Sequence, residues 1–274
     1  MSGSFKGLNQ QQIDRRLKEG RGEGIGPDYK PFIYTRDVSS LGRSHRLFGQ
    51  TSNRLHHLLS DLELAVFLVL DWSEHVTDIR EQFPMRVDDT ARIAEELGLP
   101  YFRYKDTHQV LTTDFLVDFA DTERPQMVLQ AKYSNDLQKP STIERLMIEK
   151  RYWEEKQIPW ALVTEKEISK TIFSNIEWLY PAQGDDASED DLIHHFELFD
   201  REFGDQPDKK IIAVAQKLDM SYELESGESL YWLRQLLARR YFIFDLNILF
   251  RDLTCNQLIP CNLQTIAGVM HAAG

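Results

Sequence analysis

Two short stretches with strand periodicity, separated by a turn, constrain the fold of this 274-residue chain most strongly. Residues 109–119 (QVLTTDFLVDF) are rich in β-branched and aromatic side chains, which alternate between the two faces of a strand. The following ADTERP has the composition of a turn, after which QMVLQAK resumes the alternation. The predicted hairpin is centred near residues 122–123. It sets Asp114 opposite Gln130 or Lys132, on one face of the sheet.

Asp114 is the member of this group that most needs a chemical partner. It lies within an otherwise apolar strand, where an unpaired carboxylate is costly unless it meets a metal ion or a cation. Gln130 taken alone could be an edge-strand glutamine that faces water. Lys132 could be a paired surface lysine, but its shared face with Asp114 favours a catalytic role. Carboxylates that hold Mg²⁺, with a lysine two residues after an oxygen donor, suit a metal-dependent phosphodiesterase.

The segments around the hairpin predict a mixed α/β core. Residues 58–70 (LLSDLELAVFLVL) are apolar enough for a largely buried helix, and residues 76–83 suit a first strand. Residues 141–156 begin with Ser-Thr-Ile-Glu, a capping-box pattern, and continue at helical spacing. Residues 158–164 (IPWALVT) suit a closing buried strand. This order of helix, three strands, helix and strand resembles restriction-endonuclease-like nucleases, whose motif is Asp followed by Glu-x-Lys. Gln130 stands where that motif has Glu.

Seven longer stretches carry a more specific resemblance. They occur between Ile13 and Tyr180 and read GRSHRLF, HHLLSDLELAVFL, DIREQFP, TDFLVD, QAK, EKRYWEEKQIPW and NIEWLY. In order and spacing they resemble the TnsA family, the endonuclease subunits of heteromeric bacterial cut-and-paste transposases. The catalytic set of that family is a helix Glu, a strand Asp, and the Gln and Lys of Gln-x-Lys. The resemblance places these roles on Glu63, Asp114, Gln130 and Lys132.

The resemblance also implies a metal site. Glu63 and Asp114 would bind up to two Mg²⁺ ions, for which Mn²⁺ can substitute. The Gln130 side chain and the carbonyl of Ala131 would act as neutral oxygen ligands. Lys132 would orient or help deprotonate the attacking water and offset charge on the phosphate. Because Gln130 replaces a Glu, the site carries one negative charge fewer, and DNA phosphate is expected to complete it.

Four polar residues have structural interpretations. Glu63 follows Ser60 by three residues and could close a capping box at a helix start. Glu149, on the predicted helix after the hairpin, is expected to form a salt bridge with a neighbouring Arg or Lys. His56 and His57 lack a metal-ligand partner pattern and are expected to be structural or solvated.

The distribution of charge bears on the expected DNA substrate. The net charge of −12 at pH 7 is unusual for a protein that binds DNA. Residues 1–60 nevertheless hold ten Lys or Arg against five Asp or Glu, so they carry +5 and the rest of the chain −17. Phosphate contacts and an ordinary solvated face explain this segment equally well. The weak basic surface suggests that another subunit supplies much of the DNA affinity. The basic candidates are Arg15, Arg16, Lys18, Arg21, Arg43, Arg46 and Arg54.

Composition narrows the class of protein further. Hydrophobic residues make up 42% of the chain, with no apolar run of membrane-spanning length and no secretory signal, so a cytoplasmic bacterial protein is expected. Cys255 and Cys261 cannot complete a structural zinc site alone and are expected to be reduced thiols. Residues 20–26 (GRGEGIG) lack the Gly-Lys-Ser/Thr ending of a P-loop, which argues for a loop or mobile arm.

The length allows two domains, predicted at residues 1–168 and 169–274. In the second, residues 184–191 suggest a short acidic loop, and residues 211–218 and 229–240 read as helices before the strand-like YFIFDL. Two helices and a strand resemble a small winged-helix arrangement. In TnsA-like proteins this domain engages the ATP-dependent regulator TnsC. Its acidic balance favours contact with a protein over contact with DNA.

The combined expectation is a Mg²⁺-dependent DNA endonuclease subunit with a restriction-endonuclease-like core. The resemblance implies that it cuts transposon-end DNA at the 5′ ends, while the partner transposase TnsB cuts and joins the 3′ ends. Two alternatives stay open: a non-catalytic adaptor that bridges TnsB and TnsC, and a stand-alone restriction or repair nuclease that cuts without partners. The presence of Asp114, Gln130 and Lys132 argues against the adaptor.

Overall fold

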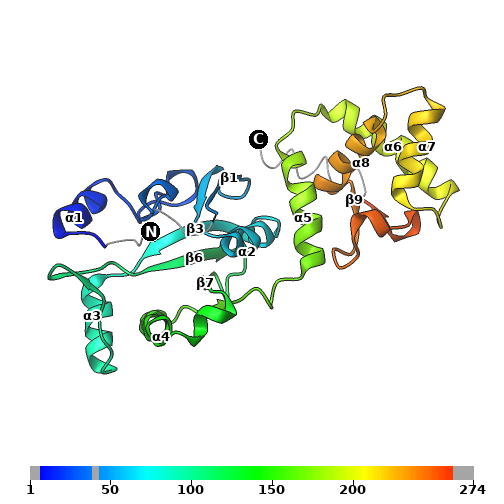
Figure 1. The fold of residues 1–274 in the computed structure, drawn as a ribbon. Coiled ribbons are helices and arrows are strands. Elements are labelled where there is room, and N and C mark those ends of the chain that lie inside the picture. Colours follow the sequence, from blue (N-terminus) through cyan, green and yellow to red (C-terminus); the bar gives the residue numbers. More distant parts are fainter. Residues whose placement is uncertain (1–6, 39–42, 262–274) are drawn as a thin grey trace. The chain divides into compact units, whose positions relative to one another are not determined.

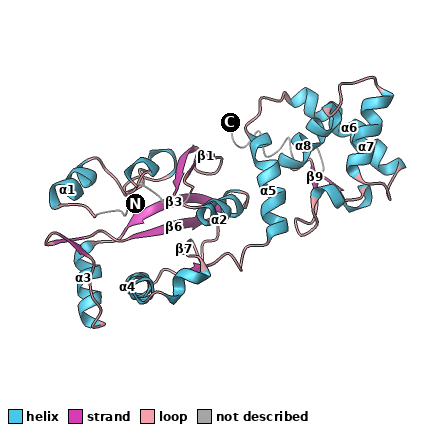
Figure 2. Cartoon of the chain, viewed as in Figure 1, coloured by secondary structure: helices cyan, strands magenta, loops and turns pink. Residues whose placement is uncertain are grey.

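The chain forms two compact units, residues 1–168 and residues 169–274, in the computed structural model (Figure 1). The structure describes residues 7–38 and 43–261. Helices and strands are mixed in the first unit, whereas the second is mainly helical (Figure 2). The fold therefore belongs to the mixed α/β class that the sequence predicts.

A four-stranded sheet forms the centre of the first unit. Antiparallel pairing joins its first three strands, and the fourth runs parallel to the third. In the central hairpin Phe115 pairs with Leu129, which confirms the predicted register and sets Asp114 across from Gln130. In sheet order, the strands are β3 (Val76–Pro84), β6 (Thr112–Phe119), β7 (Gln126–Ala131) and β8 (Trp160–Val163).

The sequence predicts two of the helices around this sheet and misses a third. The missed helix, α3 (Val87–Glu96), buries Thr90, Ile93 and Ala94 at helical spacing. The capping box predicted at Ser141 is wrong, because the helix begins at Pro140 and its N-cap, Lys139, forms no side-chain cap hydrogen bond. Proline is favoured at this first helical position, where its missing N–H costs nothing. The helices are α2 (Asp61–Asp71), α3 (Val87–Glu96) and α4 (Pro140–Glu155), with the short 3₁₀ helix η3 (Ser134–Gln138) before α4.

The hydrophobic core of this unit lies between the sheet and helices α3 and α4. Leu116 of β6 pairs with Val128 of β7, and both are buried against Ile148 and Trp153 of α4. Burial of an aliphatic side chain of this size stabilises the fold by roughly 1.5–3 kcal/mol. The central hairpin is thereby held in one register, because a slip of one residue would turn its apolar face to water. The cluster is completed by Met85, Ile93, Ala94 and Tyr152.

The N-terminal segment packs against the edge of β3. Gly22 has a φ of 87°, and a Cβ atom at this position would lie 2.2 Å from Cγ of Pro84 in β3. Only glycine fits such a close approach with this backbone conformation. The glycine-rich stretch is therefore a loop, as predicted, and it is docked on the sheet. The elements of the segment are α1 (Gln10–Lys18), η1 (Gly26–Asp28), η2 (Thr35–Asp37), β1 (His45–Gly49) and β2 (Arg54–Leu58), and a second small hairpin joins β4 (Arg103–Tyr104) to β5 (Thr107–His108).

Three of the basic candidates of this segment are buried, so neither a phosphate contact nor a solvated face describes them. Arg16 and Arg21 both pair with Asp37, at nitrogen–oxygen distances of 3.4 and 2.5 Å. Arg54 pairs with Glu81. Buried guanidinium groups require such partners because desolvation of an isolated charge is costly. Those that stay exposed are Arg15, Lys18, Arg43 and Arg46.

The second unit confirms the predicted order of two helices followed by a strand, which are α7 (Ile211–Ser221), α8 (Glu228–Ala238) and β9 (Phe242–Ile243). It also contains α6 (Glu189–Asp205), part of which was expected to be an acidic loop. Glu189, Asp190 and Asp191 form the first turn of α6, and the side chain of Ser188 caps it. Carboxylates are favoured there by the helix dipole. The described elements are α5 (Lys170–Gln183), α6 (Glu189–Asp205), α7 (Ile211–Ser221), α8 (Glu228–Ala238), β9 (Phe242–Ile243), η4 (Phe250–Asp252), η5 (Cys255–Gln257) and β10 (Ile259–Pro260).

Aromatic side chains dominate the core of this unit. Phe196, Phe199 and Phe203 of α6 are buried. The ring of Phe196 packs against that of Phe242 in β9, with 4.9 Å between the ring centroids. Cys255 is a buried thiol, in line with the expected packing role. Across the part of the chain that the structure describes, no helix is long and apolar enough to cross a membrane.

Candidate active site

Asp114 is at the centre of the candidate site. Its Oδ2 atom accepts hydrogen bonds from the backbone N–H of Ala131 at 2.9 Å and from Nζ of Lys132 at 3.1 Å. The hairpin register explains both contacts, because Ala131 and Lys132 directly follow Gln130, the residue opposite Asp114, and diagonal neighbours across antiparallel strands also lie within reach. The carboxylate is buried within the sheet, so these donors supply the partners that a buried charge requires.

Gln130 is directed at the backbone of β6. Its Oε1 atom accepts from the N–H of Asp114 at 2.8 Å, and Oγ1 of Thr113 lies 3.4 Å away. The residue is buried, so it is not an edge-strand glutamine that faces water. An amide oxygen has two lone pairs, and the N–H of Asp114 occupies one of them. The single hydroxyl proton of Thr113 is directed at Glu149, 2.5 Å away, so the second lone pair of Gln130 could accept a cation.

Lys132 places positive charge between oxygen atoms that the resemblance assigns to a metal ion. Besides Asp114, its Nζ atom contacts the carbonyl oxygen of Ala131 at 2.8 Å. Burial alone would lower the pKa of Lys132, but the carboxylates of Asp114 and Glu63 outweigh it and raise the pKa. The ammonium group is thus kept charged beside the carboxylates. Since 31% of its side chain is exposed, the group has room to turn toward solvent.

Glu63 approaches from α2, where it lies in the first turn of the helix. The N-cap Ser60 accepts from the N–H of Glu63 at 3.1 Å, and the Glu63 carboxylate accepts from the N–H of Leu59 at 2.9 Å. Ser60 thus caps the helix, but the expected capping box is not closed, because Glu63 accepts from the N–H of Leu59 and not from that of the N-cap Ser60. The same carboxylate also accepts a hydrogen bond from Nε2 of Gln82 at 3.3 Å, and Gln82 contacts Asp114 in turn.

Two buried carboxyl groups beside Asp114 have raised pKa values. Burial, reinforced by the charge of Asp114, raises the pKa of Glu63 to about 8. Burial likewise raises the pKa of Glu149 to about 8. The salt bridge expected for Glu149 is wrong: its Oε1 atom accepts from Oγ1 of Thr113 at 2.5 Å and from Nε1 of Trp160 at 3.1 Å. Such a cluster of perturbed groups is typical of functional sites.

A cavity of about 260 Å³ opens onto this group of residues. Asp114, Gln130, Lys132 and Glu149 line it, together with Arg145 of α4. The guanidinium group of Arg145 lies 4.7 Å from the ring centroid of Phe102, also in the cavity wall. The cavity therefore combines carboxylates with two cationic side chains, which suits an anionic substrate held beside a metal ion.

The oxygen donors fit Mg²⁺ and give it few protein ligands. Among the described residues there is no group of three or more His, Cys, Asp or Glu side chains placed to hold a metal ion. Glu63 Oε2 and Asp114 Oδ1 both lie 3.3 Å from Nε2 of Gln82, so they are separated by at most twice that distance. Mg²⁺ typically uses one or two carboxylates and takes its other ligands from water and substrate phosphates.

Comparison with known proteins identifies the family. Residues 73–165 match the TnsA-like endonuclease N terminal family, and residues 167–246 match the TnsA endonuclease C terminal family. Over 258 residues the chain is 42% identical to the Transposon Tn7 transposition protein TnsA of Escherichia coli, an alignment that covers 94% of each protein. The chain belongs to the TnsA family of endonucleases.

The segment that matches the N-terminal TnsA family contains three of the four candidate catalytic residues. Asp114, Gln130 and Lys132 lie inside the segment matched to the N-terminal TnsA family, whereas Glu63 precedes it. The structure nevertheless brings Glu63 to the same place, because α2 packs against β3 and β7. The site thus draws on chain outside the matched segment.

Glu81 and Gln82 of β3 were missed by reasoning from the sequence alone. Both are buried, at 0% and 2% exposed. The available signal was the run DIREQ inside a strand bounded by apolar residues, since polar side chains at buried strand positions need dedicated partners. These partners come from β2, α2 and β6, which the local sequence of β3 does not reveal.

Proposed function

We propose that this TnsA family member is a Mg²⁺-dependent DNA endonuclease subunit that cuts the 5′ ends of a transposon. The observation that carries the proposal is the convergence of Asp114 and Lys132 across the β6–β7 hairpin, at a cavity that Gln130 and Glu149 also line. The relative at 42% identity is named a transposition protein, which supports transposon-end DNA as the substrate.

The side chains divide the chemistry of phosphodiester hydrolysis among them. Glu63, Asp114 and the carbonyl of Ala131 would hold Mg²⁺, which polarises the phosphate and lowers the pKa of attacking water. Lys132 would leave Asp114 when the cation binds and turn its ammonium group toward the water or the phosphate. There it would offset the negative charge that develops in the transition state. The open side of the Lys132 side chain makes this movement feasible.

The neutral Gln130 keeps the charge of the site low. A glutamate at this position would add a negative charge beside Asp114 and strengthen metal binding in the free protein. With Gln130 the substrate phosphate would supply the missing negative charge, so that metal binding and DNA binding support each other. Cutting would thereby be restricted to assembled transposon ends.

We further propose that the two units have separate partners. The second unit has seventeen Asp or Glu against nine Lys or Arg, a formal charge of −8 over residues 169–274. Such a surface repels DNA phosphate and favours a basic protein surface. The second unit would bind the regulator TnsC, and the partner transposase TnsB would cut and join the 3′ ends.

A cleavage assay tests the enzymatic proposal directly. End-labelled transposon-end DNA is incubated with the chain in Mg²⁺, Mn²⁺ or EDTA, with and without TnsB. Metal-dependent cuts at the 5′ ends that need TnsB are the expected result. Cuts without TnsB would favour a stand-alone nuclease. The absence of 5′ cuts, with 3′ cutting by TnsB still stimulated by the chain, would favour a non-catalytic adaptor.

A further inference from the structure

Gln82 lies between the two carboxylates of the candidate metal site. Its Nε2 atom donates to Oε2 of Glu63 and to Oδ1 of Asp114, both at 3.3 Å. Its Oε1 atom accepts from Oγ1 of Thr112 at 3.0 Å. Both N–H groups and the carbonyl of the amide therefore have partners, and the amide can take one orientation only.

The backbone at Gln82 is shaped for this contact. Gln82 has a φ of 49°, a conformation that is uncommon for residues other than glycine. The neighbouring residues Glu81 and Phe83 pair with Phe115 and Thr113 of β6, while Gln82 itself has no pairing partner across from Asp114. The strand thus departs from regular geometry at the one residue that faces both carboxylates. Strained conformations of this kind cluster at functional sites.

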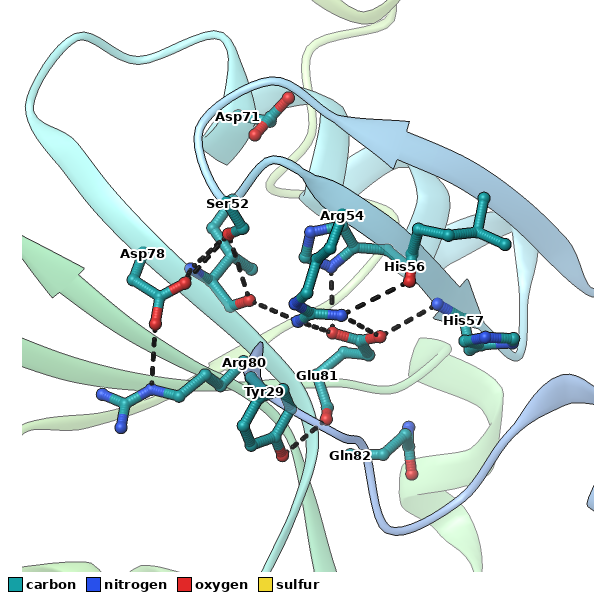
Figure 3. Close-up of polar contacts among 12 residues, drawn as sticks. Tyr29, Ser52, Arg54, His56, His57, Asp71, Asp78, Arg80, Glu81 and Gln82 are labelled. Atoms are coloured by element: carbon teal, nitrogen blue, oxygen red, sulfur yellow. Dashed lines mark hydrogen bonds and ion pairs between the residues drawn. The ribbon is translucent and has the colours of Figure 1, made fainter. Parts of the chain in front are cut away.

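The preceding residue anchors the strand in this conformation. Figure 3 shows Arg54, His56 and His57 of β2 gathered around the carboxylate of Glu81, next to Gln82. Nη1 of Arg54 donates to Oε1 of Glu81 at 3.0 Å, Nδ1 of His56 lies 2.9 Å from Oε2, and the N–H of His57 donates to Oε1 at 3.0 Å. Glu81 is fully buried, so this clamp holds it firmly.

The N-terminal segment holds the same peptide units from the other side. The hydroxyl of Tyr29 donates to the carbonyl of Glu81 at 3.0 Å, and the N–H of Phe32 donates to the carbonyl of Gln82 at 3.2 Å. The β1–β2 hairpin and the chain that precedes it, at Tyr29 and Phe32, therefore both contact the irregular position of β3. Their contacts stabilise a backbone conformation that the strand alone would not adopt.

We propose that Gln82 is a positioning residue that holds Glu63 and Asp114 facing each other for a divalent cation. This inference rests on the metal-dependent function proposed above. An amide suits the role because it donates to two carboxylates without adding charge, whereas a lysine would compete with the cation. Each carboxylate retains an oxygen lone pair for the ion while Gln82 holds its orientation. Hydrogen bonds to metal-binding carboxylates commonly have this effect.

The test compares Mn²⁺ affinity, read by electron paramagnetic resonance, in wild-type protein and in Gln82→Met. Methionine keeps the length of the side chain and removes the donors, so an affinity loss of about 10- to 100-fold is expected. Gln109→Met is the matched control. Gln109 is also buried and borders the same cavity, but within residues 7–38 and 43–261 its Nε2 atom donates to backbone carbonyls alone, those of Leu8 and Thr107. Gln109→Met should lower the stability of the folded protein and leave its Mn²⁺ affinity unchanged.

Two further variants separate positioning from folding. Gln82→Asn keeps an amide and a residue type that tolerates positive φ, but it is too short to reach both carboxylates, so Mn²⁺ affinity should again fall. In a Glu63→Gln background, Gln82→Met should cost less than in the wild type, because one of its two partners is already altered. A purely structural residue would give additive losses.

The outcomes distinguish this inference from the function on which it rests. Suppose that folded Gln82→Met binds Mn²⁺ with the affinity of the wild-type protein, while Asp114→Ala no longer binds it. This result would leave the proposed metal site intact and overturn the positioning role of Gln82. Equal losses in Gln82→Met and Gln109→Met would also overturn it, because a general effect of destabilisation would then suffice. The absence of saturable Mn²⁺ binding in the wild-type protein, with and without transposon-end DNA, would overturn the metal-dependent function itself.

Discussion

Nζ of Lys132 donates to Oδ2 of Asp114 at 3.1 Å, across the two central strands of the sheet. The pair joins the chain's best candidate for a metal ligand to its best candidate for stabilising charge on a phosphate. Because Lys132 also contacts the carbonyl of Ala131, its ammonium group takes the place that the proposed cation would occupy. Binding of Mg²⁺ and release of Lys132 are therefore expected to be linked.

Asp114→Ala should abolish strand cleavage, lowering the rate by at least roughly 100-fold, because it removes a proposed metal ligand and little core volume. Cleavage of labelled transposon-end DNA in the presence of TnsB measures the effect. Asp118→Asn is the matched control, since Asp118 lies on the same strand and pairs with Arg80 at 2.6 Å, outside the cavity. A folded Asp114→Ala protein that cuts normally would contradict the site.

Lys132→Ala should change the products of transposition rather than prevent joining. If this chain cuts only the 5′ ends, as proposed, TnsB would still cut and join the 3′ ends through its own active site. The transposon then stays attached to donor DNA, and replication gives donor–target fusions in place of simple insertions. Scoring product type in cells, with protein level checked, measures this. Simple insertions at normal frequency would contradict the role of Lys132, and loss of all joining would show that the two activities are coupled.

Metal affinity should rise with pH up to about pH 8. The pKa of Glu63 is raised to about 8, so the carboxyl group is largely protonated at pH 7 and must lose its proton when a cation binds. Below this pKa the apparent affinity should increase about tenfold per pH unit for each proton released. Mn²⁺ titrations between pH 6 and pH 9 measure the slope. A flat profile would mean that Glu63 does not bind the ion, and Glu63→Gln should flatten it.

Glu81→Gln should destabilise the first unit by about 3–5 kcal/mol, because it leaves Arg54 buried without its counter-charge. Burial alone would raise the pKa of Glu81, but His56 and Arg54 outweigh it and lower the pKa to about 2, from an ordinary value of 4.5. The stability from this pair is therefore complete above about pH 4.5 and is lost as the pH falls toward 2. Denaturant unfolding between pH 3 and pH 7 measures both effects.

A surface pair provides the control for Glu81. Glu155 contacts Arg92 at 2.6 Å, and both side chains are partly exposed. Because water screens such a pair, Glu155→Gln should have a much smaller effect on unfolding. Similar losses for Glu81→Gln and Glu155→Gln would contradict the importance of the buried clamp.

Residues 169–274 should fold alone and bind TnsC without nuclease activity. The unit has its own aromatic core, and the proposed active-site residues lie in the other unit. Circular dichroism and a pull-down with purified TnsC test this fragment beside residues 1–168. Binding by residues 1–168 alone would reverse the assignment of the two units.

Local periodicity predicted the central hairpin, the strands β3 and β8 beside it and the helices α2 and α4, but missed α3 between β3 and β6. Alternation in residues 109–119 and in QMVLQAK places Asp114, Gln130 and Lys132 together, because opposed strand residues approach each other whatever the rest of the fold does. The two helices after residue 210 followed from apolar spacing in the same way. Helix α6 was missed in part because acidic residues suit a solvated loop and a first helical turn equally well.

Only the tertiary structure decided how charged and polar side chains are used. Arg54 looked like a candidate phosphate contact, yet Glu81 of another strand buries it. Glu149 looked like a surface ion-pair partner, yet it is buried and accepts hydrogen bonds from Thr113 and Trp160. The run DIREQ indicated that Gln82 needs a partner but not which one, because its partners Glu63 and Asp114 lie 19 and 32 residues away. Backbone periodicity is encoded locally, whereas the partner of a buried polar group is set by long-range packing.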